Sequence, residues 1–350
     1  MTQNFSFSEY YKSSYLINCD KKSNENCFSS KHGFQFSARL ISTISLPIQL
    51  FAFFCILKKT PKNMNSVKMS LLNLNFWYLL TGILYAFLST PYFFYPHLAG
   101  FYIGFLSDFE VSNAVQSFIG CPVSFAMIIS IMSLFENRSS LIINNIFSIK
   151  KARTRILWIS GNFLACMGLV TPIYLNLPDQ EIGKKDLLKE LPCPPVSFFT
   201  ESILIFAFSG FWETYSTTVI ILVNTILLFQ TLFFSTCCLY YLLYAKSNHV
   251  SSETRRLQIR SFFATVLQTT IPIMCLLIPT IIFMLKNDNE QFSQTKNNLT
   301  FLPAILHKGI GSLCIILVHY PYRKFLFSLI YCERNKKTIV KVSHCSAQHF

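Results

Sequence analysis

The chain has 350 residues, of which 52% are hydrophobic, 16% aromatic and only 13% charged. The charged share is about half that of an ordinary soluble protein, and the apolar share excludes a disordered chain. The net charge of +14 does not indicate a nucleic-acid partner, because no compact basic domain with base-reading aromatic side chains is present. The composition therefore predicts a polytopic membrane protein that binds no nucleic acid.

Seven segments are long enough and apolar enough to cross a bilayer, which takes about 20 residues. Because lipid offers the backbone no hydrogen-bond partners, these segments are expected to be helices. The predicted fold class is all-α, a bundle of seven transmembrane helices, with a tail before it (1–37) and another after it (321–350). Within the membrane domain, 38–320, the predicted spans are 38–57, 69–92, 113–135, 156–176, 217–244, 261–285 and 300–320.

The basic residues are divided unequally between the two sides of this bundle. One side, formed by 58–68, 136–155, 245–260 and the tail from 321, carries 19 Lys and Arg against three acids. The other side carries 10 basic residues and 13 acids. Because cytoplasmic connections are enriched in Lys and Arg, the first side is predicted to be cytoplasmic and the amino terminus to lie outside.

Three cysteines fall on the predicted outer side, where disulfides form. Cys193 is expected to pair with Cys19 or Cys27, which would tie the long outer loop 177–216 to the amino-terminal tail. A local bridge between Cys19 and Cys27 is the alternative. Either arrangement leaves one thiol unpaired.

Two other kinds of modification site are visible. Asn4-Phe5-Ser6 and Asn298-Leu299-Thr300 are glycosylation sequons on the predicted outer side. Cys332 follows an apolar stretch just beyond the seventh span, which makes it a palmitoylation candidate or, alternatively, an unmodified buried thiol.

Four short motifs stand beside these spans: Lys58-Lys59-Thr60-Pro61-Lys62-Asn63-Met64 with Val67-Lys68, Phe135-Glu136-Asn137-Arg138, Leu191-Pro192-Cys193-Pro194, and His319-Tyr320-Pro321-Tyr322-Arg323. In this order, over nearly the whole chain, they resemble the nematode serpentine chemoreceptors of class H, a branch of the seven-helix G protein-coupled receptors. The basic Lys-Thr-Pro loop and the terminal Pro-Tyr-Arg weigh most. One departure is that the family tends to have glycine after His307, where this chain has Lys308.

The resemblance implies a chemosensory receptor in the plasma membrane of a sensory neuron, which binds a small molecule and signals to a heterotrimeric G protein. Glu136-x-Arg138 stands where better-known receptors end their third helix with an acid–arginine pair, so Arg138 is implied to face the cytoplasmic cavity. Tyr322 and Arg323 are the second candidate coupling segment. For both segments the other interpretation is anchoring at the positive inner membrane surface.

Ligand sites in helical bundles are mostly apolar with a few polar groups. The sequence offers five polar candidates for the outer half of the bundle, and their alternative role is hydrogen bonding between helices. Lys308 is expected to face the bundle, because an ammonium in lipid costs about 2.5–3.5 kcal/mol. No cofactor or metal is expected. The candidate ligand-binding residues are Gln116, Gln268, Thr269, His307 and Lys308.

Other functional classes find less support. No predicted span contains an Asp or Glu, the seven histidines form no His-x₃-His pattern, and no Gly-x-Ser-x-Gly turn occurs, so the chain is not expected to be an enzyme. The alternative to a receptor is a seven-helix ligand-gated channel or a small-solute transporter. Such proteins usually place several charges inside the membrane, whereas Lys308 is the one charge well inside a span here.

Overall fold

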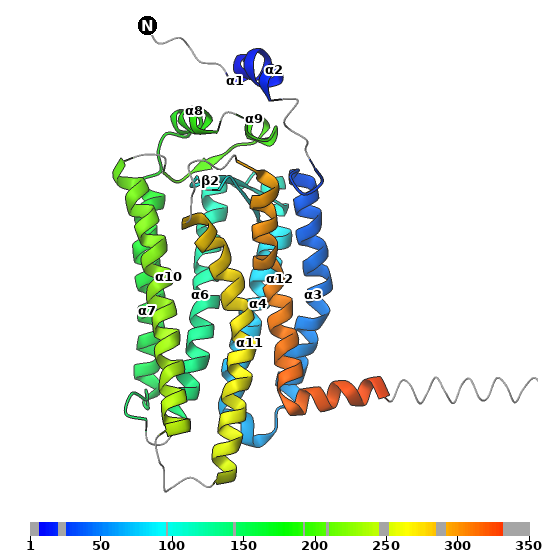
Figure 1. Cartoon of the computed structure of the whole chain (residues 1–350), viewed down its shortest axis with the longest axis vertical. Helices are drawn as coiled ribbons and strands as arrows, with labels where there is room; N and C mark the ends of the chain where they lie inside the picture. Colours follow the sequence, from blue (N-terminus) through cyan, green and yellow to red (C-terminus); the bar gives the residue numbers. More distant parts are fainter. Residues whose placement is uncertain are drawn as a thin grey trace, which may run out of the picture.

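Seven long helices lie side by side and form the body of the molecule (Figure 1). The structure is a computed structural model that describes residues 7–19, 26–95, 97–142, 145–191, 193–207, 210–244, 252–284 and 292–331. Within these residues, six helices are long and apolar enough to cross a membrane, and α11 runs among them. The long helices are α3 (Lys31–Lys59), α4 (Asn65–Ile83), α6 (Asn113–Ser140), α7 (Ala152–Leu175), α10 (Gly210–Leu239), α11 (Ser252–Met284) and α12 (Gln294–Val318).

Three of these helices begin at a serine whose hydroxyl accepts a hydrogen bond from the first turn. Ser30 accepts from the backbone N–H of Gly33, Ser112 from that of Val115, and Ser293 from that of Lys296. Such N-caps satisfy donors that a helix start otherwise leaves unpaired. They explain why α3 and α12 begin several residues before the predicted spans, since polar capped turns precede the apolar segments.

A small antiparallel sheet, absent from the expected fold, lies across one end of the bundle. Strand β1 (Thr90–Phe93) pairs with β2 (Ala99–Ile103), with Thr90 opposite Ile103, and β2 pairs with β3 (Leu204–Ile205). The predicted second span, 69–92, therefore ends in a strand instead of a helix. Its helix continues as the π-helical turn η3 (Leu84–Leu88), and Pro91 then favours an extended conformation at Thr90.

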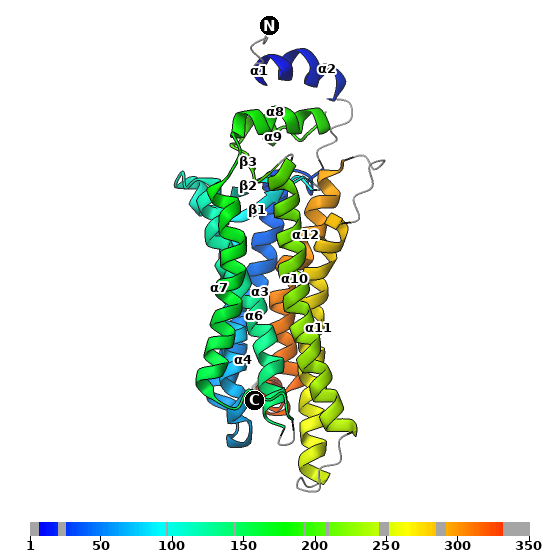
Figure 2. The same cartoon turned by 90° about the vertical axis from the view of Figure 1, so that its left-hand side faces the viewer.

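Short helices stack over this sheet (Figures 1 and 2). We call this the covered end of the bundle. Its core of buried aromatic and aliphatic side chains includes Phe34 of α3, Phe101 of β2 and Phe198 of α9. The covering elements are α1 (Phe7–Tyr10), η1 (Tyr11–Tyr15), α2 (Leu16–Asn18), α5 (Phe105–Asp108), α8 (Gln180–Glu190) and α9 (Ser197–Thr200).

The opposite end, which we call the open end, carries the connections with the most basic residues. A 3-10 turn, η2 (Lys62–Met64), joins α3 to α4, and η4 (Tyr240–Tyr244) continues α10. After α12 a final helix, 320–331, turns sharply away from the bundle (Figure 1). A second buried core fills the bundle here, with Leu71, Met127 and Ile315 among its members.

Glycine lets α12 approach its neighbours closely. A β-carbon added at Gly311 would lie 2.7 Å from the ring of Tyr78 on α4, so α4 and α12 can touch only because this side chain is absent. Helix α12 also packs against α3 and α11. Residues on this part of α12, including His307 and Lys308, are consequently enclosed by three helices.

Candidate functional site

A cavity of about 630 Å³ opens at the open end of the bundle. It lies between η2, α6, α10, α11 and the segment that follows α12, so every wall comes from a different part of the chain. Its lining is polar and cationic on one side and apolar on another. The cationic and polar members include Ser66, Arg138, Gln258, Arg260, Ser261 and His319, and the apolar members include Leu141, Ile142, Leu242 and Phe262.

Arg138 on α6 is the innermost cation of this cavity. Its Nε donates to the hydroxyl of Thr265 on α11 at 3.2 Å. Its Nη2 is buried and has no hydrogen-bond partner among the described residues. A guanidinium carries five donors in a fixed fork, so Arg138 retains donor capacity toward anything that enters the cavity.

Glu136 lies on the other side of α6 and does not share a site with Arg138. Residues two apart in a helix do not face each other, which explains why the Glu136-x-Arg138 spacing does not produce a pair. The Glu136 side chain is fully buried, and its carboxylate lies 2.8 Å from Nε of Arg155 on α7. It also accepts from the Ser140 hydroxyl at 2.6 Å. Glu136 thus joins α6 to α7 and does not line the cavity.

Tyr322 and Arg323 occupy the turn after α12. Tyr322 is fully buried, and its hydroxyl lies 2.7 Å from that of Thr60, at the end of α3. Arg323 is half-buried and donates from Nη1 to the carbonyl of Leu317 at 3.1 Å. Both side chains hold the end of α12 in place, and neither is among the cavity-lining residues.

The five predicted ligand residues do not converge, which corrects that expectation. Gln268 lies 3.3 Å from His319 at the open end, and Thr269 bonds back to the carbonyl of Thr265, the partner of Arg138. The reason is that α11 begins nine residues before the predicted span and places Gln268 and Thr269 near the level of the cavity.

Gln116 belongs to the covered end and serves as a structural tie. Its side chain is buried, accepts from the Ser89 hydroxyl at 2.8 Å, and donates to the carbonyl of Val111 at 2.7 Å. It also donates to Ser107 at 3.1 Å. These bonds hold the loop before α6 against the end of η3.

His307 and Lys308 lie inside the bundle, at mid-length of α12. Lys308 is 3% exposed, and its ammonium lies 5.4 Å from the ring centre of Tyr85. The His307 ring meets Tyr78 edge-on at 6.0 Å, and neither its nitrogens nor the Tyr78 hydroxyl makes a hydrogen bond of normal geometry to a described residue. Of the five candidates, these two lie at mid-bundle, whereas Gln268 and Thr269 lie near the cavity and Gln116 lies at the covered end.

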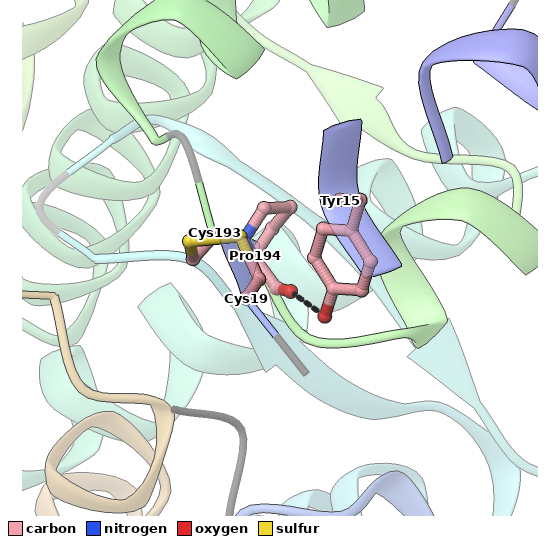
Figure 3. The surroundings of a disulfide bond; sticks show 4 residues. All are labelled: Tyr15, Cys19, Cys193 and Pro194. Carbon is pink, nitrogen blue, oxygen red and sulfur yellow. Dashed lines mark hydrogen bonds between the residues drawn. A yellow bond between two sulfur atoms is a disulfide. The ribbon is translucent and has the colours of Figure 1, made fainter. Parts of the chain in front are cut away.

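The covered end is fastened by a disulfide between Cys19 and Cys193, shown in Figure 3. Of the arrangements open from the sequence, this one ties the amino-terminal helices to the long loop, and Cys27 is left as an exposed free thiol. Beside the bridge, the hydroxyl of Tyr15 donates to the carbonyl of Pro194 at 2.6 Å (Figure 3). The segment 7–19 is therefore part of the cover.

Further contacts of the cover were not anticipated from the sequence. The Tyr92 hydroxyl donates to the carbonyl of Ser29 at 2.5 Å, and Lys31 pairs with Glu201. Lys184 of α8 lies over the ring of Phe7 at 5.2 Å, and burial lowers the pKa of its ammonium although nearby carboxylates oppose this. These residues carried no motif, and only the fold brings them together.

The structure describes one of the three predicted modification sites. Asn298 is 3% exposed, and its amide donates to the carbonyl of Phe28 at 2.7 Å. A glycan on this nitrogen would require the contact to break, so we expect Asn298 to remain unglycosylated. Asn4 and Cys332 lie outside the described residues.

The residues that match known proteins include nearly all of this architecture. Residues 29–332 match the family described as "Serpentine type 7TM GPCR chemoreceptor Srh". The chain is also similar to "Serpentine receptor class H-72" of Caenorhabditis elegans, with 40% identity over 341 residues and 96% of each chain covered. The matched region begins before α3 and ends after the helix 320–331, so it contains all seven long helices and the cavity.

Proposed function

Because this chain belongs to the serpentine chemoreceptors of class H, a family of seven-helix G protein-coupled receptors, we propose that it detects a small molecule and signals to a heterotrimeric G protein through the cavity at its open end. It is a multi-pass membrane protein of the chemoreceptor type. In this proposal the covered end is extracellular, the open end is cytoplasmic, and the plasma membrane of a sensory neuron is the site of action.

The unpaired guanidinium nitrogen of Arg138 is the observation that carries the coupling proposal. A buried donor without a partner is costly unless a ligand or partner satisfies it in another state. The cavity has a volume typical of a specific binding site, and Arg138 is among its lining residues. A partner helix ending in exposed backbone carbonyls supplies the acceptors that Arg138 lacks.

The test compares Arg138→Ala with Arg153→Ala in cells that report G-protein activation. Arg153 also lies at the open end, but its side chain is exposed, so it controls for the loss of one basic residue. With an activating compound found in an odorant panel, Arg138→Ala should keep its surface level and lower the response at least about tenfold, the effect of roughly 1.4 kcal/mol. A parallel fall in surface level and response, or equal losses in both variants, would assign Arg138 to membrane anchoring.

The orientation rests on the charge distribution and has its own test. Cys27 is an exposed free thiol at the covered end, so a membrane-impermeant maleimide should label it on intact cells. Cys27→Ser should remove this signal, because the other free thiols among the described residues are buried or partly buried in the long helices. Labelling that appears only after permeabilisation would place the covered end in the cytoplasm.

We place the small-molecule contact at His307 and Tyr78, whose buried polar atoms make no hydrogen bond of normal geometry with a described residue. A hydroxyl or carbonyl compound satisfies such atoms, and the surrounding apolar side chains accommodate its carbon skeleton. His307→Phe should therefore leave surface expression intact and weaken compounds that carry a hydrogen-bonding group. An unchanged response across the panel would move the ligand site elsewhere.

A further inference from the structure

Lys308 is a buried cation without a protein counter-charge. Its side chain is 97% enclosed, and its ammonium makes no ion pair or hydrogen bond with any residue that the structure describes. Its closest favourable contact is the ring face of Tyr85, at 5.4 Å from the ring centre. A ring face stabilises an ammonium by only about 0.5–2 kcal/mol, less than the cost of placing that charge inside a membrane.

The sequence offers no acid at this depth. None of the seven predicted spans contains an Asp or Glu, and the buried carboxylate of Glu136 is already paired with Arg155 near the open end. A rotamer change of Lys308 therefore cannot bring its charge to a carboxylate within the membrane-spanning part of the bundle. A charged Lys308 therefore takes its compensating charge from outside the chain, and the rival arrangement is a deprotonated, neutral amine.

A small cavity lies beside this lysine. Its volume is about 10 Å³, the space of a single particle the size of a water molecule. Lys308 of α12 and Ser42 and Gln49 of α3 are among its lining residues, so side chains that carry an ammonium, a hydroxyl and an amide border the cavity. Among the described residues, no hydrogen bond engages the Ser42 hydroxyl or the Gln49 side-chain amide, which leaves both available as donors.

Helix α4 and the π-helical turn that continues it also border this region. Gly82 of α4 forms part of its wall, where an added β-carbon would lie 3.7 Å from the Gln49 amide and 3.9 Å from the Lys308 chain. The π-helical turn Leu84–Leu88 follows directly and presents Tyr85 to the ammonium. Inserted π-helical turns are frequent at functional sites.

From this arrangement we propose that the cavity between Lys308, Ser42 and Gln49 binds a single monovalent anion as the counter-ion of Lys308. Because the cavity has room for about one water-sized particle, a halide or the end of a small carboxylate enters only when the flexible Lys308 and Gln49 side chains move outward. The anion is either free or part of the receptor's ligand. Lys308 supplies the charge, and the hydroxyl and amide supply hydrogen bonds to the anion. The site does not depend on the proposed ligand contact or on G-protein coupling.

The experiment measures the thermal unfolding of the full chain, purified in nanodiscs and freed of chloride by prolonged dialysis against gluconate, which is too large for the cavity. After the exposed thiol of Cys27 has been blocked with maleimide, a thiol-reactive dye reports unfolding, because Cys55 and Cys238 are fully buried in the folded protein. Chloride is titrated at constant ionic strength, and a parallel titration uses formate. Wild-type protein should show a saturable rise of about 2–4 °C in its unfolding temperature.

Three variants identify the site. Lys308→Met keeps the length of the side chain and should abolish the rise, whereas Lys324→Met, at an exposed position of the final helix, should respond as wild type. Gln49→Leu removes one donor and should raise the chloride concentration for half-effect about tenfold. If Lys308→Met does not fold, the chloride response of Gln49→Leu alone tests the site.

The outcomes separate the proposal from its rivals. A rise with formate and not with chloride supports the anion site and assigns it to a carboxylate group. No rise with either anion, or an equal rise in wild type and Lys308→Met, refutes the site and leaves Lys308 a neutral buried amine. None of these results depends on finding an activating odorant or a coupled G protein, so failure here leaves the receptor proposal intact.

Discussion

Removing the Arg155 side chain should destabilise the junction of α6 and α7 substantially. In Arg155→Met the fully buried Glu136 carboxylate loses its cation at 2.8 Å and keeps only the Ser140 hydroxyl. Breaking a fully buried ion pair costs about 3–5 kcal/mol. Since 32% of the Arg155 side chain is exposed, water replaces part of its contribution, and we expect a loss of about 2–3 kcal/mol.

The assay is a double-mutant cycle of unfolding temperature and surface expression. Glu136→Gln removes the charge but keeps the shape, and the double variant Glu136→Gln/Arg155→Met buries no lone charge. The double variant should therefore be more stable than Arg155→Met alone, with a coupling energy of about 1–3 kcal/mol between the two positions. Additive effects, or an Arg155→Met protein as stable as wild type, would refute the view that Glu136 serves structure and not coupling.

Two further predictions concern the ends of the bundle. Tyr322→Phe should lower the free energy of unfolding by about 1 kcal/mol, because it removes the hydroxyl contact with Thr60, and Thr60→Val should lower it by a similar amount. Non-additive losses in the double variant would show that the two hydroxyls share one hydrogen bond. Asn298→Gln should leave electrophoretic mobility before and after glycosidase treatment unchanged, because Asn298 is buried against the Phe28 carbonyl. A mobility shift specific to Asn298→Gln would show that a glycan is attached there.

The sequence was sufficient to predict the helices because the membrane restricts the choice. Apolar segments of about 20 residues have to form helices in lipid, and this rule needs no knowledge of neighbouring segments. The same rule explains why the predicted ends of the helices are less accurate than their existence. α6 continues to Ser140, five residues past its predicted span, because a helix does not stop where its apolar stretch stops.

The sheet could not be predicted from the same evidence. Residues 69–107 carry no charge, and an apolar stretch of this kind fits a helix or a buried strand equally well. Pro91 is a local signal for an extended segment, but the pairing of β2 with β3 joins Gly100 to Leu204 across about a hundred residues. Register at that distance depends on the packed fold.

Side-chain partners were the hardest feature to predict. The sequence placed Gln268 beside His307 on composition alone, whereas depth along each helix decides which residues meet. Gln268 contacts His319 because α11 extends far into the open end, and Thr265 meets Arg138 for the same reason. Glu136 and Arg138 point to different sides of α6, because residues two apart in a helix do not face each other.

The covered end limits how a ligand can reach the middle of the bundle. The disulfide between Cys19 and Cys193 fixes the amino-terminal segment over the sheet, and the bonds from Tyr92 to Ser29 and from Lys31 to Glu201 fasten the same layer to α3. A compound arriving from the covered side has to displace several of these contacts together. An apolar compound that first dissolves in the bilayer meets no such barrier at the sides of the bundle. If the covered end is extracellular, as we propose, this geometry predicts that lipophilic odorants activate the receptor more readily than highly charged solutes. Reducing the disulfide should therefore change the response to polar compounds more than the response to apolar ones.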